Sequence, residues 1–404
     1  MRDEEDRCVR RGRTGPGAAR LAAAGALALF AHGLSAQPLP NVIAWGDVGW
    51  FGSPPSDATN VVAASDGGDH ALLLRADGTA LEWGSTGLFP PPTNILATLT
   101  NVLAVAAAPE FSSVLRADGT VVAWGYYACY FAVPPDLSNP ATALTNPVAS
   151  LAAWLDLRAD RAAEAWTYAI APGEGWVCSP SVVPGLTNAV AVAGGGPFTV
   201  ALQPDGTVAA AGEDPYGYGV LNVPPGLTNV VGVSAGGWFS MALRAEGTVK
   251  VWGDNTYGQT NVPPDLTNAV AIAAGAAHCL ALRSDGTVVA WGGAGEPVNY
   301  GQTNVPPGLS NAVGVAAGGF TSVAIIGAAM PPAQVALTNM AFGPGGFTVQ
   351  VPTDRQRVYG LEYKNSLTDA RWTLLPLVAG TGATAQLTDP APGAAQRFYR
   401  VRRW

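Results

Sequence analysis

The sequence predicts an all-β fold, in which seven blades of short antiparallel strands close into a propeller and a small β-sandwich follows. Three observations support this prediction. A motif of about forty residues recurs over most of the 404-residue chain. The chain has 50 glycines and 33 prolines but is also 48% hydrophobic, which is typical of many short strands joined by many turns. The first and last repeats are incomplete in complementary ways, which indicates a closed ring.

The clearest repeat runs from Asn229 to Pro264. Val230 to Ala235 is an apolar run rich in β-branched residues, so it predicts a first strand. Apolar and other residues alternate over Phe239 to Arg244, which predicts a half-buried second strand. After a tight turn at Gly247, a third strand is expected over Val249 to Gly253. A loop and a Pro-rich separator then lead to the next repeat.

The same features recur in register along the chain. An acidic residue followed by Gly marks the turn between the second and third strands, and a Trp-Gly pair usually ends the third strand. Residues 45, 83, 124, 166, 211, 252 and 291 occupy the Trp position and lie 38 to 45 residues apart. Because Asp77, Asp118, Asp205, Glu246 and Asp285 repeat at one place, we interpret them as turn residues and the tryptophans as packing anchors. The third full repeat is degenerate, with Asp160-Arg161 at the turn and Trp166-Thr167 after it.

The two ends of the repeat region complete each other. Asn41 to Gly46 resembles only a third strand, whereas Ala312 to Ala317 and Phe320 to Ile326 resemble only the first two. An open solenoid would need polar caps, and closure removes exposed strand edges. Six full repeats and one composite repeat therefore predict seven blades, with Ile43 and Ala44 paired to the segment 322–324.

The repeated pattern resembles a known family. Leu-Arg-x-(Asp/Glu)-Gly-Thr-Val, Trp-Gly and Tyr-Gly-Gln, in register over residues 41–327, are similar to the repeats of RCC1-like (regulator of chromosome condensation) propellers. The likeness is greatest to the short bacterial secreted variety, which includes a β-lactamase inhibitor protein. The resemblance implies a seven-bladed propeller over 37–327. It does not carry over nucleotide exchange or β-lactamase inhibition, because an export signal and acidic charge argue against the first and the loops differ for the second.

Residues 1–36 predict a signal peptide. Arg10, Arg11 and Arg13 precede the apolar core Leu21 to Leu34, which is too short to span a membrane, and small residues near Ala36 offer a cleavage point. Because the chain starts with several acids, a mispredicted extension remains the alternative. We expect a secreted or cell-surface protein, a monomer without a transmembrane segment.

The C-terminal part changes character. Residues 328–333 are a predicted linker, and 334–404 lack the repeat motif. Regularly spaced short strands predict a small β-sandwich, broadly fibronectin-like. The expected strands are Val335 to Leu337, Phe347 to Val351, Tyr359 to Tyr363, Trp372 to Leu377, Thr384 to Leu387 and Phe398 to Val401.

Three cysteines follow the leader. Cys129 and Cys178 lie in the loops after the Trp position of consecutive repeats, so a disulfide between them is possible in an oxidising compartment, but spacing does not establish the pairing. Cys279 lies within a predicted strand and is expected to be a small buried hydrophobe.

The sequence contains no convincing catalytic or metal-binding constellation. His70 and His278 occupy a position that other repeats fill with Phe111, Ala153, Phe198, Phe239 and Phe320, so we interpret it as a packing slot. No Cys/His spacing indicates a metal site, and we predict no cofactor. The net charge of −8 argues against nucleic acid as a partner.

Irregular aromatic loops suggest a binding face. All follow the Trp position, so in a propeller they emerge on one side, where aromatic clusters hold proteins or stack on sugars. Packing of these loops on their own blades is the alternative. The residues are Trp50, Phe51, Tyr126, Tyr127, Tyr130, Phe131, Tyr168, Trp176, Tyr216 and Tyr218.

Three functions follow from these features. The preferred hypothesis is an exported, non-enzymatic binding or scaffold protein with a protein or glycan partner. The second is a secreted hydrolase that uses Glu174, Glu213 and Asp214 from neighbouring loops. The third is a purely structural surface protein in which the C-terminal module serves attachment.

Overall fold

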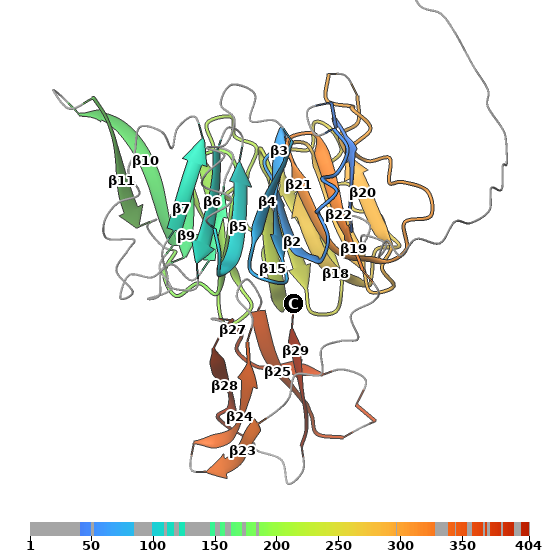
Figure 1. Cartoon of the computed structure of the whole chain (residues 1–404). Helices are drawn as coiled ribbons and strands as arrows, with labels where there is room; N and C mark the ends of the chain where they lie inside the picture. Colours follow the sequence, from blue (N-terminus) through green and yellow to red (C-terminus); the bar gives the residue numbers. More distant parts are fainter. Residues whose placement is uncertain are drawn as a thin grey trace, which may run out of the picture. The chain divides into compact units, whose positions relative to one another are not determined.

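The computed structural model is all-β: no helix occurs among the residues it describes (Figure 1). The predicted signal peptide and linker lie outside them. The described residues are 41–49, 52–84, 99–108, 111–116, 121–125, 146–149, 154–157, 163–171, 175–182, 186–295, 297–327, 338–343, 345–353, 358–366, 368–369, 372–380, 383–391 and 397–403.

The clearest repeat forms three antiparallel strands in the order β15-β16-β17. Their bounds, Val230–Ala235, Phe239–Arg244 and Val249–Gly253, confirm the predicted ones. The central strand differs from the expectation in one respect. It is buried on both faces rather than one, and Ser240 is as inaccessible as Phe239. The next repeat covers one of its faces, because the first strand β18 of that repeat also contacts β16.

Four other repeats have the same three-strand order. In each, the second strand lies between the first and the third, and all pairings are antiparallel. These sheets are β2 (Val61–Asp66), β3 (His70–Arg75) and β4 (Ala80–Gly84); β5 (Val102–Ala108), β6 (Phe111–Arg116) and β7 (Val121–Gly125); β12 (Ala191–Gly194), β13 (Phe198–Leu202) and β14 (Val208–Gly212); and β18 (Ala269–Ala274), β19 (His278–Arg283) and β20 (Val288–Gly292).

The degenerate repeat has a fourth strand that the sequence did not predict. Its sheet has the order β11-β10-β9-β8. The segment after the Trp position does not leave as a loop but folds back as a hairpin, in which Tyr168 faces Cys178 in backbone register. The four strands are β8 (Asn146–Ala149), β9 (Trp154–Leu157), β10 (Ala163–Ala171) and β11 (Gly175–Val182).

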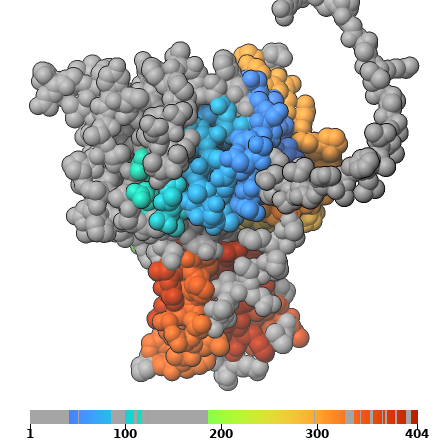
Figure 2. Space-filling view, in the orientation of Figure 1, coloured from blue at the N-terminus to red at the C-terminus, as the bar shows by residue number. Residues whose placement is uncertain are grey.

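The composite sheet joins the two ends of the repeat region. The N-terminal strand β1 (Val42–Gly46) pairs with β22 (Thr321–Ile326), which pairs with β21 (Ala312–Gly318). Ile43 faces Ala324 and Ala44 faces Val323, which confirms the predicted closing pair. In Figure 2 the blue atoms of the first repeats adjoin the orange atoms of the last one.

Contacts run from sheet to sheet and return to the first. The first strand of each repeat contacts the first strand of the next, from β2 through β5, β8, β12, β15 and β18 to β21. Strand β21 then contacts β2 again. Thus every sheet of the repeat region has a neighbour on both sides.

The Trp position anchors one repeat to the preceding loop. The indole N–H of Trp252 donates to Val220 O (3.0 Å), that of Trp291 to Gln259 O (2.8 Å) and that of Trp45 to Gln302 O (2.7 Å). These side chains are at most 7% exposed, as are Trp83 and Trp124. The predicted packing role of these tryptophans is confirmed.

The Asp-Gly turns also have the predicted structural role. The carboxylate of Asp77 accepts hydrogen bonds from both the hydroxyl and the backbone N–H of Thr79, and Asp205 and Asp285 repeat this with the Thr two residues on. The Thr hydroxyl lowers the pKa of each of these carboxyls. The carbonyl of the turn glycine accepts the N–H that opens the next repeat, as between Gly206 and Val230 (3.0 Å). Each turn therefore ties two sheets together.

The predicted packing slot, the first position of the second strand, is confirmed, but the assignment of Phe320 to it was wrong. Phe198, Phe239, His70 and His278 all face the Gly of their Trp-Gly position in the register and are buried. In the composite sheet Gly46 faces Thr321, not Phe320. The Gly-Gly pair before the slot gives the reason, because Phe320 follows Gly319 as Trp238 follows Gly237, one residue before the slot.

A slot histidine bridges to the next sheet through a serine. A hydrogen bond joins His70 Nε2 and Ser112 Oγ (2.7 Å), and an equivalent one joins His278 Nε2 and Ser322 Oγ (3.0 Å). Where the slot holds Phe198, the serine of the next sheet, Ser240, has no hydrogen-bond partner among the described residues. The histidines are therefore structural bridges rather than simple space fillers.

The C-terminal module consists of two sheets. One has the order β23-β24-β28, and in the other β25 pairs with β26, β27 and β29. Phe347 and Val349 from the first sheet and Tyr359 and Leu361 from the second belong to one hydrophobic cluster. The strands are β23 (Thr338–Gly343), β24 (Gly346–Pro352), β25 (Val358–Lys364), β26 (Thr373–Leu374), β27 (Val378–Ala379), β28 (Thr384–Asp389) and β29 (Phe398–Arg403).

One expected C-terminal strand differs from the structure, because the predicted strand at Trp372 to Leu377 is reduced to β26. Strands β23 and β27 were not predicted. Val335 to Leu337 lies outside the described residues.

The module packs on the repeat region at the turns that join second and third strands. The Arg402 guanidinium donates to Ala245 O (2.8 Å), and the backbone N–H of Leu377 donates to Pro204 O.

Removing β1 should abolish closure. A chain that begins at residue 47 leaves the β22 edge unpaired and loses the Trp45 anchor, so we expect aggregation or a loss of several kcal/mol of stability. Size-exclusion chromatography and thermal unfolding measure this, with a chain that begins at residue 39 as the matched control. Equal unfolding temperatures for the two chains would contradict the closing role of β1.

The two serines provide a second test. Ser112→Ala deprives buried His70 of a partner and should cost about 1–2 kcal/mol of unfolding free energy. Ser240→Ala removes a hydroxyl without a partner and should be neutral or stabilising. Urea unfolding of both variants measures the difference, and equal losses would disprove the bridge.

His278 should make the protein sensitive to acid. Burial lowers its pKa to about 4 from 6.5. Between these values the unfolded chain binds a proton that the folded protein does not, so stability falls as the pH drops from 6.5 towards 4. His278→Phe places a residue that the slot accepts elsewhere and should flatten this decline. Urea unfolding of both proteins across this range tests it, and an unchanged slope in the variant would refute it.

Candidate functional site

The candidate site is the side of the repeat region at which third strands end. We call it the loop face and define it as the residues that directly follow the third strands together with the turns between first and second strands. Backbone hydrogen bonds connect successive turns: Gly196 N donates to Gly237 O (3.0 Å), and Gly237 N to Ala276 O (3.2 Å). A Cβ at Gly237 would lie only 2.8 Å from Ala276 O, so glycine permits this close approach. The turns therefore form a rigid platform beneath the loops.

An aromatic cluster projects from this platform. The Tyr216 and Trp238 rings pack edge to face with centroids 4.8 Å apart, and Tyr218 lies 5.7 Å from Tyr216 and 6.0 Å from Trp238. Tyr216 is 67% exposed and Tyr218 40% exposed, whereas Trp238 is half-buried. The cluster combines residues from two neighbouring repeats. It offers a preformed apolar surface with phenol hydroxyls at its edge, as at many recognition sites.

Acidic residues hold this loop in place. The Asp214 carboxylate accepts the backbone N–H groups of Tyr218 (2.9 Å) and Gly219 (2.7 Å), and Glu213 is anchored through its own N–H to Pro197 O (2.9 Å). Both oxygens of Asp214 thus serve the loop conformation. The third carboxylate of the hydrolase hypothesis, Glu174, lies outside the described residues.

A second aromatic pair shows that part of the pattern is repeated. Tyr300 is 47% exposed and packs against Phe320, with centroids 5.0 Å apart. Tyr300 precedes a glycine with φ of +82°, as Tyr218 precedes Gly219 with +80°. The sequence pattern marks Tyr218 as irregular, because its loop is two residues shorter than that of Tyr300. It also missed Trp238 and Phe320, which the shared Gly-Gly-aromatic pattern could have identified.

The other predicted binding residues cannot be placed on this face. Tyr168 and Trp176 belong to the β10–β11 hairpin, in which Tyr168 faces Cys178 and Trp176 faces Ile170 in the register. Trp50, Phe51, Tyr126, Tyr127, Tyr130, Phe131 and Cys129 lie outside the described residues, so these predictions and the Cys129–Cys178 disulfide stay predictions. Cys279 is buried and burial raises the pKa of its thiol, as expected for a small buried hydrophobe.

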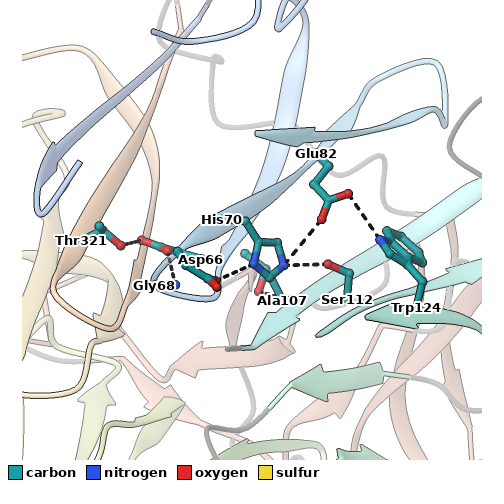
Figure 3. Close-up of polar contacts among 10 residues, drawn as sticks. Asp66, Gly68, His70, Glu82, Ala107, Ser112, Trp124 and Thr321 are labelled. Atoms are coloured by element: carbon teal, nitrogen blue, oxygen red, sulfur yellow. Dashed lines mark hydrogen bonds and ion pairs between the residues drawn. The ribbon is translucent and has the colours of Figure 1, made fainter. Parts of the chain in front are cut away.

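A polar cluster lies where the first sheet meets its neighbours (Figure 3). His70 Nδ1 lies 2.7 Å from Asp69 Oδ1, and its Nε2 lies 2.7 Å from Ser112 Oγ and 3.9 Å from a Glu82 oxygen. Glu82 also accepts the Trp124 indole N–H (3.3 Å). Burial raises the pKa of Glu82. Other described repeats have Val or Ala at the position of Glu82, so the sequence departs from its own pattern here.

Asp66 is a second residue that departs from the repeat pattern, and it lies where the first sheet contacts the composite sheet. Asp66 accepts hydrogen bonds from the Thr321 hydroxyl (2.6 Å) and from Gly68 N (2.8 Å). Burial raises the pKa of Asp66 to about 6. The other described repeats place Ala or Gly at the position of Asp66. This pair links residues 255 positions apart.

The Asp69, His70 and Ser112 side chains are arranged in the order of a catalytic triad, but their burial is wrong for catalysis. The serine and the histidine are fully buried, and only the carboxylate, at 30% exposure, reaches solvent. A nucleophile must be accessible to substrate. His278 and Ser322 repeat the bridge with Ala277 in place of the acid. The arrangement is therefore a packing device at a joint between sheets.

The described part of the chain lacks two kinds of feature. It contains no group of three or more His, Cys, Asp or Glu residues placed to hold a metal ion. It also contains no helix long and apolar enough to cross a membrane.

Comparisons with known proteins identify the repeat. Residues 230–259 and 269–302 each match the family model of the regulator of chromosome condensation (RCC1) repeat. A search of curated proteins finds no match. Among solved structures, Prp20p from Saccharomyces cerevisiae is similar, with a TM-score of 0.54, 20% identity and coverage of 72% of this chain and 92% of that one.

Two more structures agree. Yeast RCC1 (Prp20) in its complex with Kap60 gives a TM-score of 0.55 at 18% identity, with 73% and 91% coverage. Human WBSCR16 gives 0.53 at 16% identity, with 72% and 99% coverage. At these identities the likeness concerns the fold alone. Residues 230–259 and 269–302 are therefore similar to RCC1 repeats, and the chain has the fold of an RCC1-like β-propeller.

Proposed function

We propose that this chain is an exported, non-enzymatic binding protein whose propeller closes as seven blades and presents its loop face to a protein or glycan partner. The observation that carries the proposal is the exposed cluster of Tyr216, Tyr218 and Trp238. A contiguous cluster of exposed apolar rings marks an interaction site more than a single exposed ring does, and Tyr and Trp are frequent anchors in interfaces.

The arrangement of the sheets supports the seven-bladed ring. The contacts between first strands return from β21 to β2, and β1 completes the composite sheet. The shared core of the two C-terminal sheets similarly supports a β-sandwich for residues 334–404. We place residues 1–36 as the export signal of a secreted or cell-surface monomer.

The position of the C-terminal module favours binding through the loop face. Its contacts at Pro204 and Ala245 lie at the turns that join second and third strands, which are at the opposite strand ends. The module therefore leaves the aromatic cluster free. Prp20p, which shares the fold, is described by its binding to Gsp1p and histones, so propellers of this kind can act as binding surfaces. A purely structural role would not require these exposed rings.

Binding should depend on the two exposed tyrosines. The chain from residue 37 would be screened against a glycan array and a display library of short random peptides. We expect ligands that the wild type retains and that Tyr216→Ala/Tyr218→Ala weakens roughly tenfold or more, because the variant loses the central ring contacts. The variant should unfold at the wild-type temperature, since both side chains are exposed.

Val62→Ala serves as the matched control. Val62 is 45% exposed near the opposite end of β2, so its truncation also removes surface apolar area but spares the loop face. If every glycan and peptide binds the double variant as tightly as it binds Val62→Ala, the proposed binding face is overturned.

A further inference from the structure

The Lys and Arg residues of the repeat region are distributed unevenly over its two sides. Residues 41–327 contain seven Lys and Arg residues. Arg75, Arg116, Arg244 and Arg283 end second strands, on the side away from the loop face. These arginines have structural tasks there, since Arg244 Nε donates to Thr228 O (2.9 Å) and Arg283 pairs with Asp265 (2.6 Å). The other three cations of this region are Arg158, Arg161 and Lys250.

Among the described residues, the loop face has acidic side chains but no Lys or Arg. Neither the segments that follow the third strands nor the turns between first and second strands contain Lys or Arg in the sequence. The described acids of these segments include Asp47, Asp69, Glu213, Asp214 and Asp254. Because these described segments have acids and no Lys or Arg, the electrostatic potential beside them should be negative.

The acids and the aromatic cluster occupy the same loop. Glu213 is exposed and lies three residues before Tyr216 in a segment whose conformation Asp214 fixes. Exposed Tyr and Trp rings attract guanidinium and ammonium groups over their faces, and carboxylates beside them strengthen that attraction. A phosphorylated or sulfated polymer would be repelled, and an uncharged sugar would gain nothing from the acids.

We propose that the partner of the loop face is a protein that presents Arg and Lys side chains to Tyr216, Tyr218 and Trp238. This inference rests on the proposed function and narrows it to one ligand chemistry. The rings supply the contact area, and the acids select the sign of the partner's charge.

Three peptide pools of equal length test the proposal. The peptides of all three pools have random apolar and polar residues at most positions. The remaining, fixed positions carry Arg or Lys in the first pool, Glu or Asp in the second, and uncharged Ser or Gln in the third. Binding to the full chain from residue 37 is measured for the wild type, Tyr216→Ala/Tyr218→Ala, Glu213→Lys and the control Val62→Ala, at about 50 and 300 mM salt.

We expect tyrosine-dependent binding only in the Arg/Lys pool. It should weaken several-fold with salt and roughly tenfold in Glu213→Lys, which reverses a charge beside the rings, whereas Val62→Ala should bind as the wild type. Two results would overturn the inference and leave the binding face intact. One is tyrosine-dependent binding of the Glu/Asp pool, the Ser/Gln pool or a glycan on the array. The other is tyrosine-dependent binding that Glu213→Lys does not change. If neither a pool nor the array distinguishes the wild type from the tyrosine variant, the proposed function itself fails.

Discussion

The pairing of β1 with β22 is the interaction on which the repeat region depends. Each repeat places its second strand between two others and covers it on both faces, so a repeat without neighbours would expose both its edges and its faces. The composite sheet solves this for the last repeat, because β1 supplies the strand that the sequence after Ile326 lacks. Asn41 reinforces the joint, since its side-chain amide donates to both Val61 O (3.0 Å) and Ile326 O (3.1 Å). Closure is thus built from side-chain and backbone bonds together.

The joints between sheets also explain where the sequence departs from its own repeat. Where a buried side chain departs from the repeat pattern and is polar, a side chain of an adjacent sheet forms a hydrogen bond with it. His70 is opposite Ser112, and Asp66 is opposite Thr321. A buried polar group requires a partner, so substitutions at a joint are tolerated mainly in pairs. Ser240, whose neighbouring slot holds Phe198, is an exception that costs the protein one unsatisfied hydroxyl.

Most of the fold of the repeats could be predicted from the sequence, because strand periodicity, Asp-Gly turns and Trp-Gly pairs recur in register. The bounds of β15, β16 and β17 and the closing pair followed directly. The errors came from positions that depend on pairing across space. Thr321 fills the slot because it faces Gly46, which counting along the chain did not reveal. The different lengths of their loops concealed the equivalence of Tyr218 and Tyr300. The aromatic loop face was predicted in part, but Trp238 joins it from a neighbouring repeat, and partner chemistry required the distribution of charge over both sides.

The separation of Asn41 from Ile326 by 285 residues has a consequence for biosynthesis. The ribosome delivers β1 before any other strand of the repeats and β22 after all the rest, so a nascent chain must carry its first strand without a lasting partner while the intervening sheets assemble. Apolar, uncharged β1 would then be open to premature association until β22 has been synthesised.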